Sequence, residues 1–131
     1  MGMKPGKSCV DIGIVVSDIS KSLAFYEGLL GLEKIGEMPL WFGTMHRMGF
    51  GDSFVKLIDP KQVPPAGPQG LAKGLGFRYL TFQISNIDEI CAACTSAGVE
   101  FEIEKQELMP GVTIAMVRDP DGNVVEFVQR D

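Results

Sequence analysis

The spacing of apolar residues along the first half of the chain predicts one strand, one helix and three further strands. CVDIGIVVSD is rich in β-branched and apolar residues, which is typical of a strand. DISKSLAFYEGLLG has apolar residues at helical spacing, with Asp18 as the N-cap and Gly31 as the end of the helix. The predicted elements are a strand at 9–18, a helix at 18–31 and strands at 32–38, 44–50 and 53–59.

The second half of the chain repeats this order of elements. VVSDI in the first half matches QISNI in the second, and GDSFVKL matches DGNVVEF, both at an offset of about 70 residues. Asn86 is the expected N-cap of the second helix and Gly98 its end. The predicted elements are a strand at 77–85, a helix at 86–98 and strands at 99–106, 111–119 and 123–129. An internal repeat of this kind predicts two similar modules, neither of which covers its own sheet fully.

A segment rich in proline and glycine separates the two repeats. DPKQVPPAGPQGLAKGLG excludes regular structure over about fifteen residues. A loop of this length in a small domain is usually a functional lid or a linker. We therefore expect one domain over residues 1–131, made of a module at 9–59, a loop at 60–77 and a module at 78–130.

Composition and charge narrow the class of protein. The 131 residues carry a formal net charge of −5, which argues against a nucleic-acid partner and is compatible with a cationic ligand. No apolar run approaches the roughly 18 residues of a membrane helix, and the first residues lack the apolar core of a signal peptide. We expect a cytoplasmic protein whose three cysteines are reduced thiols.

The last predicted strand contains a carboxylate on an apolar face. Side chains alternate along a strand, so Val124, Glu126 and Val128 share one face, and Val125 and Phe127 the other. A carboxylate is costly to bury without a partner. Glu126 is therefore expected to have one.

Two motifs show a specific resemblance to a known family. IGIVVSDISKSLAFYEGLLGLE and VRDPDGNVVEFVQ resemble the vicinal oxygen chelate superfamily, which includes glyoxalase I, bleomycin-resistance proteins and extradiol dioxygenases. The resemblance implies an α+β fold of two βαβββ modules in one chain, forming a cupped mixed sheet around a cavity. It also implies a small-molecule ligand and a homodimer. The cavity could form within one chain or between chains that exchange halves.

Metal-using members of that family hold a divalent ion at four strand positions, usually His, Glu or Gln. By motif these positions correspond here to Asp11, Lys56, Tyr79 and Glu126. Only Glu126 is of the expected type, and the charge of Lys56 repels a divalent ion. We therefore expect no cofactor, and expect Lys56 to be the partner of Glu126. A divalent metal held by Asp11, Glu126 and His46 is the less favoured alternative.

Other residues are weaker candidates for the site. His46, the one histidine, is expected to share a strand face with Met48 and Phe50, and Arg47 points the other way. Trp41 and Phe42 precede that strand and could stack on a flat ligand. Tyr79, His46, Trp41 and Phe42 are the candidate substrate-binding residues, each with ordinary packing as the alternative.

Two further patterns are interpreted structurally. Cys91 and Cys94 fall on one apolar stripe of the second helix, which favours buried core cysteines over a redox pair. Glu100, Glu102 and Glu104 alternate along one strand and predict a solvated face with no chemistry.

Two functions follow from the sequence and the resemblance. The first is a glyoxalase-like enzyme of lyase or isomerase type, independent of metal and acting on a small carbonyl or anionic substrate. Glu126 and Asp11 would transfer protons, and Lys56 would stabilise negative charge. The second is a metal-free protein that sequesters a ligand, as bleomycin-resistance proteins do.

Overall fold

The computed structural model describes residues 1–131 and divides the chain into two compact units, Met1–Pro65 (unit 1) and Ala66–Asp131 (unit 2). The division falls inside the predicted loop at 60–77. No strand or helix forms between the last strand of unit 1 and the first strand of unit 2, as the prolines and glycines predict. No helix in either unit is both long enough and apolar enough for a membrane span.

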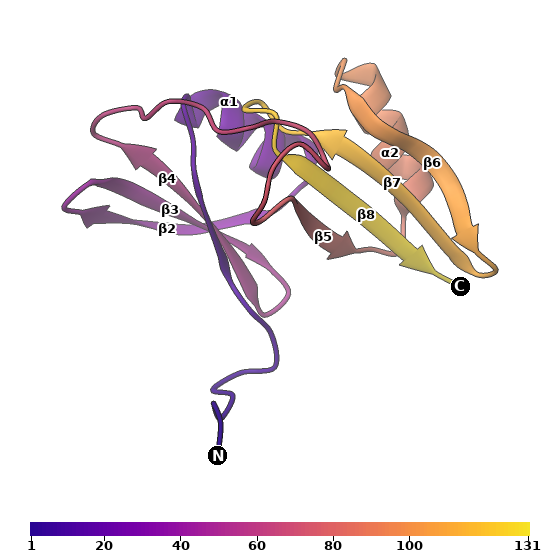
Figure 1. Ribbon diagram of the computed structural model, residues 1–131, viewed down its shortest axis with the longest axis horizontal. Coiled ribbons are helices and arrows are strands. Elements are labelled where there is room, and N and C mark those ends of the chain that lie inside the picture. Colours follow the sequence, from indigo (N-terminus) through magenta and orange to yellow (C-terminus); the bar gives the residue numbers. More distant parts are fainter. The chain divides into compact units, whose positions relative to one another are not determined.

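Unit 1 is a four-stranded mixed sheet with one helical segment (Figure 1). Its strand order is β1-β4-β3-β2, with β1 parallel to β4 and the other pairs antiparallel. The helical segment begins as an α-helix and ends in a π-helical turn. The elements are β1 (Ile12–Val15), α1 (Ile19–Leu23), η1 (Ala24–Leu29), β2 (Glu33–Leu40), β3 (Gly43–Phe50) and β4 (Ser53–Pro60).

Unit 2 has the same connectivity and the strand order β5-β8-β7-β6. Its single parallel pair is β5 with β8, which corresponds to β1 with β4 in unit 1. The elements are β5 (Tyr79–Gln83), α2 (Ile87–Ser96), β6 (Phe101–Met109), β7 (Val112–Arg118) and β8 (Val124–Arg130). Two βαβββ modules of one topology confirm the predicted repeat and the α+β class.

The two helices begin in different ways. Asp18 Oδ1 accepts hydrogen bonds from the backbone N–H groups of Ser20 at 3.1 Å and Lys21 at 3.3 Å, as the sequence predicts. Asn86 occupies the N-cap position of α2, but its side chain does not cap the helix. Asn86 Nδ2 instead donates to Glu89, and Gln129 Oε1 accepts from the Ile87 N–H at 2.8 Å. The prediction that Asn86 caps α2 is therefore wrong.

The strands of unit 1 separate two sets of side chains. Thr44, His46 and Met48 of β3 share one face with Val55 and Leu57 of β4; we call this the His46 face. Its residues Met48, Val55 and Leu57 are almost completely buried, and α1 packs against β4. The other face, here the Lys56 face, includes Asp11, Gly13, Glu33, Met45, Arg47, Phe54, Lys56 and Ile58.

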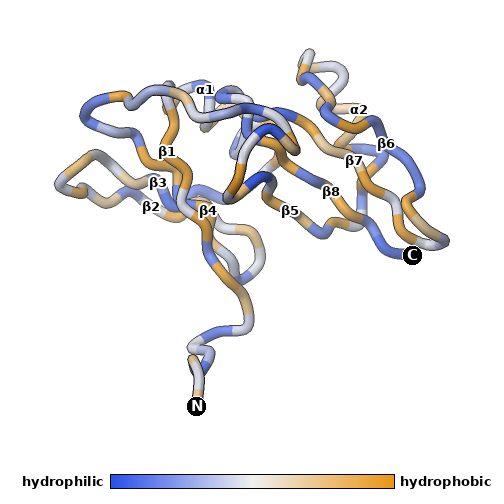
Figure 2. Tube along the Cα trace, in the orientation of Figure 1, coloured by the Kyte–Doolittle hydropathy of each residue, from blue (hydrophilic) through white to orange (hydrophobic).

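Unit 2 builds its core mainly from β7, β8 and α2. Hydrophobic residues recur along β7, and the C-terminal end of the chain is hydrophilic (Figure 2). Ala115, Val117, Val125 and Phe127 are almost completely buried. Cys91 and Cys94 of α2 are also buried and free of disulfides, which confirms that they are core residues.

Candidate functional site

Asp11 forms a fixed ion pair at the edge of the Lys56 face. Its Oδ1 accepts a hydrogen bond from Lys7 Nζ at 2.7 Å and another from the Phe54 backbone N–H at 2.8 Å. The hydrogen bond from Lys7, and next the one from Phe54, lower the pKa of Asp11, and the positive charge of Lys56 acts in the same direction. Asp11 therefore fits a permanent negative charge better than a group that takes up a proton near neutrality.

Lys56 is half-buried and lies beside Gly13 of β1 and opposite Arg47 of β3. Its ammonium makes no hydrogen bond or ion pair within unit 1. Directly opposite residues of an antiparallel pair have neighbouring side chains, so two positive charges meet on this face. The sequence predicts only that Arg47 points away from His46, and the strand pairing adds that it faces Lys56.

Phe54 lies between cationic side chains on the same face. Lys7 Nζ lies 4.4 Å from the centroid of its ring, and the guanidinium carbon of Arg47 lies 5.1 Å from it. Both distances are within the range of a cation–π interaction. The Lys56 face therefore combines three cations, one aromatic ring and two carboxylates: Asp11, which already has partners, and Glu33, which is in register with Gly49.

Glu126 has a partner within unit 2 that the sequence analysis missed. Thr81 Oγ1 donates a hydrogen bond to Glu126 Oε1 at 2.7 Å. The two residues are in register across the parallel pair β5 and β8, where Tyr79 lies opposite Val124. Glu126 is half-buried and makes no ion pair within its unit. The pairing of Glu126 with Lys56 stays a prediction.

The four positions that correspond to the family's metal ligands do not fit a divalent ion. Lys56 supplies a cation in place of a donor, and Asp11 is already bonded to Lys7 and to a backbone N–H. Tyr79 is a phenol, exposed to 52% of its area. Within each unit, no group of three or more His, Cys, Asp or Glu side chains is placed to hold a metal ion.

His46 lies on the face of unit 1 opposite Asp11 and Lys56. It is in register with the buried Leu57 and is itself only 7% exposed. Its Nδ1 lies 3.4 Å from Glu37 Oε1 without the geometry of a hydrogen bond. The structure therefore places His46 among the buried side chains of the His46 face, and a metal set that combines His46 with Asp11 would need side chains from opposite faces of one sheet.

Trp41 and Phe42 form the turn between β2 and β3. Their rings meet edge to face with centroids 4.9 Å apart, and Trp41 is exposed to 85% of its area. The pair is accessible to a flat ligand, and its role in binding stays a prediction.

Glu102 contradicts the prediction of a solvated acidic face on β6. Its side chain is only 16% exposed. Glu102 Oε2 accepts from Arg118 Nε at 2.7 Å, and Oε1 accepts from the Leu71 backbone N–H at 3.1 Å. These bonds lower the pKa of Glu102, the Leu71 bond most and the Arg118 bond next. Glu102 thus links the loop at residues 60–77, here called the glycine-rich loop, to β6 and β7.

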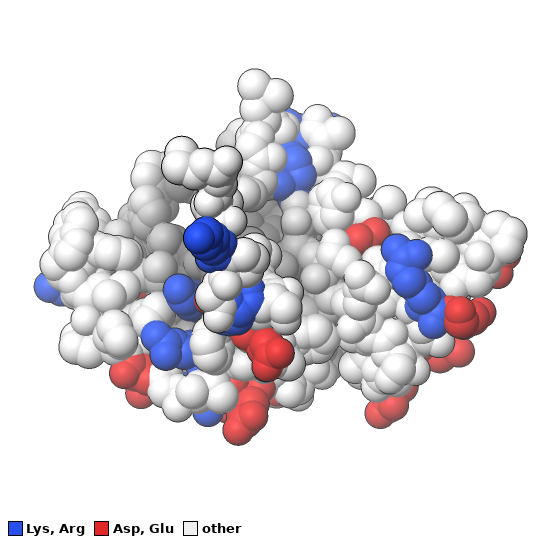
Figure 3. Space-filling model, turned by 90° about the horizontal axis from the view of Figure 1, so that it is seen from below, with Lys and Arg blue, Asp and Glu red and all other residues white.

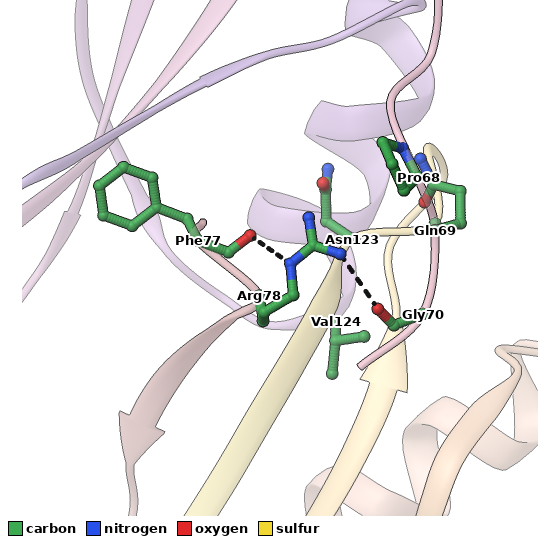
Figure 4. A pocket seen from close by; sticks show the side chains of 8 residues that line it. Pro68, Gln69, Gly70, Phe77, Arg78, Asn123 and Val124 are labelled. Carbon is green, nitrogen blue, oxygen red and sulfur yellow. Dashed lines mark hydrogen bonds between the residues drawn. The ribbon is translucent and has the colours of Figure 1, made fainter. Parts of the chain in front are cut away.

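A small hollow lies where this loop meets the beginning of β8 (Figure 4). Arg78 donates to the carbonyl oxygens of Phe77 at 3.0 Å and Gly70 at 3.4 Å. Its cavity volume is about 30 Å³, far below the roughly 300 Å³ at which small-molecule sites begin. The hollow is therefore a loop anchor more than a ligand site. Its lining residues are Pro68, Gln69, Gly70, Phe77, Arg78, Gly122, Asn123 and Val124.

Charge elsewhere on the surface is mixed. On the face drawn in Figure 3, basic and acidic side chains are interspersed, with no continuous basic field. Lys105 of β6, for example, pairs with Asp88 of α2. This distribution agrees with the acidic net charge of −5.

Comparisons with known proteins agree with the fold. The sequence model described as Glyoxalase/Bleomycin resistance protein/Dioxygenase superfamily matches residues 9–127. A probable lactoylglutathione lyase of Vibrio parahaemolyticus is 27% identical over 117 residues, which cover 87% of this chain and 84% of that protein.

Two solved structures show similar folds. A glyoxalase family protein from Enterococcus faecalis superposes with a TM-score of 0.75 at 23% identity, covering 94% of this chain and 98% of the other. TnmS3, an antibiotic binding protein from Streptomyces sp. CB03234, has a TM-score of 0.74 at 25% identity, covering 98% of this chain and all of its own. On these grounds the chain belongs to the Glyoxalase/Bleomycin resistance protein/Dioxygenase superfamily.

Proposed function

We propose that the chain is a glyoxalase-like enzyme of lyase or isomerase type that acts on a small carbonyl or anionic substrate without a metal ion. The proposal rests on the position and the charge of Lys56. It stands at a strand position that corresponds to a metal ligand in relatives, and its ammonium has no anionic partner in unit 1. An ammonium there would supply the positive charge that relatives obtain from an ion.

Each candidate residue has a role that fits its surroundings. Lys56 would bind the substrate's carbonyl or anionic oxygen and stabilise the negative charge that develops on it. Glu126, which accepts a hydrogen bond from the neutral hydroxyl of Thr81, would accept or return the proton. Asp11, held by Lys7, would act as a fixed charge that orients nearby cations and would not itself titrate.

The relatives suggest the first substrates to assay. Proteins named lactoylglutathione lyase, such as that of Haemophilus influenzae at 26% identity, cover 87% of this chain. The first substrate to assay is therefore methylglyoxal with glutathione. The second is pyruvate, a simple carbonyl compound with a carboxylate. In D2O, proton abstraction beside the carbonyl replaces hydrogen by deuterium, which NMR measures directly.

The proposal predicts that chelator-treated protein catalyses this exchange, and that Lys56→Gln or Glu126→Gln slows it about a hundredfold or more, as expected when a general acid–base or charge-stabilising group is lost. Lys61→Gln is the matched control, since Lys61 is an exposed lysine of the same unit. Exchange that requires an added divalent ion, or that Lys56→Gln leaves unchanged, would contradict the proposal.

A ligand-sequestering function is the second candidate. It is favoured by the likeness to TnmS3 and by the exposed ring of Trp41. Trp41 is the one tryptophan of the chain, so its fluorescence reports on binding nearby. Quenching by bleomycin or another aromatic cation that is recovered unchanged, together with no exchange activity, would select this function over the first.

A further inference from the structure

We infer that Arg47 and Lys56 together bind an oxyanionic group, a carboxylate or a phosphate, of the small-molecule ligand. The inference rests on the proposed function, because it takes Lys56 as part of the ligand site. It adds a residue that the family motifs do not indicate. It also narrows the ligand to compounds that carry an oxyanion.

Two like charges oppose each other on the Lys56 face. Arg47 and Lys56 are directly opposite each other in the antiparallel pair of β3 and β4. Like charges in this position destabilise a sheet. The pair therefore lowers the stability of the ligand-free protein, as expected of a site kept for binding.

No carboxylate of unit 1 forms an ion pair with Arg47 or Lys56, although Glu33, in register with Gly49, lies on the same face. Asp11, on the same face, is bonded to Lys7 and to the Phe54 N–H. Glu37 lies on the His46 face, where it is within 3.6 Å of Lys34 and 3.4 Å of His46. The two cations thus have an excess of positive charge that the unit itself does not neutralise.

The side chain of Arg47 also has an unsatisfied hydrogen-bond donor. Arg47 Nε is buried and has no hydrogen-bond partner. A buried donor without an acceptor is costly, and a guanidinium presents its N–H groups as a planar fork that suits two oxygens of one carboxylate or phosphate. An oxyanion bound by the other N–H groups of the guanidinium would offset part of this cost and screen Arg47 from the charge of Lys56.

The guanidinium of Arg47 also lies close to the ring of Phe54. Its carbon lies 5.1 Å from the centroid of the Phe54 ring, and the backbone N–H of Phe54 is bonded to Asp11. The ring and its anchored backbone hold Arg47 in place before the ligand arrives. A preorganised cation loses less entropy on binding than a mobile surface lysine.

Calorimetric titration at low ionic strength tests the inference, with sodium oxalate and inorganic phosphate as the two probes. We expect one of them to bind, and Arg47→Gln to weaken that binding about tenfold to a hundredfold, the loss typical of a hydrogen bond to a charged group. Arg47→Lys keeps the charge without the fork and should recover part of the affinity. Arg130→Gln, on the exposed end of β8, is the matched control and should change nothing. Preference for oxalate identifies a carboxylate and preference for phosphate a phosphoryl group.

Urea unfolding without probe provides an independent readout. Arg47→Gln should raise the unfolding midpoint, because it removes the like-charge opposition, and added probe should reverse the order of stability. Binding unaffected by Arg47→Gln, no binding of either probe, or a lower midpoint for Arg47→Gln without probe would overturn the inference. In those cases, if Lys56→Gln still slows the deuterium exchange of the substrate, the proposed function stands without this inference. If Lys56→Gln does not slow that exchange, the proposed function and this inference both fail.

Discussion

The Thr81 hydroxyl donates a hydrogen bond to Glu126 Oε1 at 2.7 Å, across the parallel pair β5 and β8. Val124 and Val128, which flank Glu126 on the same face, are buried. The half-buried carboxylate therefore has one neutral partner and no cation from its own unit. Such a group is available for interaction with a ligand or another charged side chain.

Replacing Thr81 by valine keeps the shape of the side chain and removes the donor. We expect Thr81→Val to lower the free energy of unfolding by about 1 kcal/mol, the usual net value of one hydrogen bond. Urea denaturation measures this loss. Thr113→Val on β7 is the control, because Thr113 makes no side-chain hydrogen bond. Equal effects of the two substitutions would show that the Thr81–Glu126 bond contributes nothing to stability.

Glu102→Gln is expected to release the glycine-rich loop locally. The substitution weakens the bonds to Arg118 and to the Leu71 N–H. Hydrogen exchange of the Leu71 amide should become about tenfold faster, which corresponds to the loss of roughly one charge-assisted hydrogen bond. Glu100→Gln, whose side chain is 72% exposed, should leave that exchange unchanged. An unchanged Leu71 rate in the Glu102 variant would remove the anchoring role.

The ion pair of Asp11 predicts a dependence of stability on pH. The pKa of Asp11 is lowered in the folded state, first by the hydrogen bond from Lys7. Its contribution to stability is therefore fully present above the unfolded value of about 3.9 and is lost as the pH falls through the folded pKa. Lys7→Gln should raise the pKa of Asp11 and flatten the loss of stability below about pH 4.

NMR titration of the Asp11 carboxyl carbon measures that pKa directly. Lys4→Gln is the control, since Lys4 is an exposed lysine in the same N-terminal segment and does not pair with Asp11. A pKa that stays in place after Lys7→Gln, or moves equally with Lys4→Gln, would exclude Lys7 as the main cause.

The cysteines should differ in reactivity. Burial raises the pKa of Cys94 to about 11 and also raises that of Cys91, so both remain thiols near neutrality. Cys9 is less buried and should react first with iodoacetamide at pH 7.5, with the other two labelled only after addition of urea. Mass spectrometry of the peptides measures which cysteines have been labelled. Rapid labelling of Cys94 in the folded protein would show that α2 opens or packs differently.

The repeat and the order of elements could be predicted from the sequence because local patterns determine them. Alternating apolar residues defined the strands, and Asp18, Gly31 and Gly98 marked helix ends that the structure confirms, with both glycines at positive φ. The cap of α2 could not be predicted, because Gln129, 42 residues away, replaces the local Asn86 contact.

The site was predicted less completely, because its contacts join distant segments. Lys56 and Asp11 were identified by motif, and the structure places Asp11 close enough to Lys56 to feel its charge, bonded to the N–H of Phe54. The roles of Thr81 and Arg47 depend on strand register, which residue types alone do not determine. Glu102 was misinterpreted because its alternating pattern resembles a solvated edge, while its true partners come from the loop and from β7.

Elemental analysis of the purified protein measures whether Lys56 takes the place of a metal ion. The protein is isolated without a tag, equilibrated with zinc, nickel and manganese, and freed of loose ions by gel filtration. We predict far less than one bound ion per chain, and binding that appears only when Lys56 is replaced by glutamate. About one ion per chain in the unmodified protein, lost on Glu126→Gln, would contradict the account.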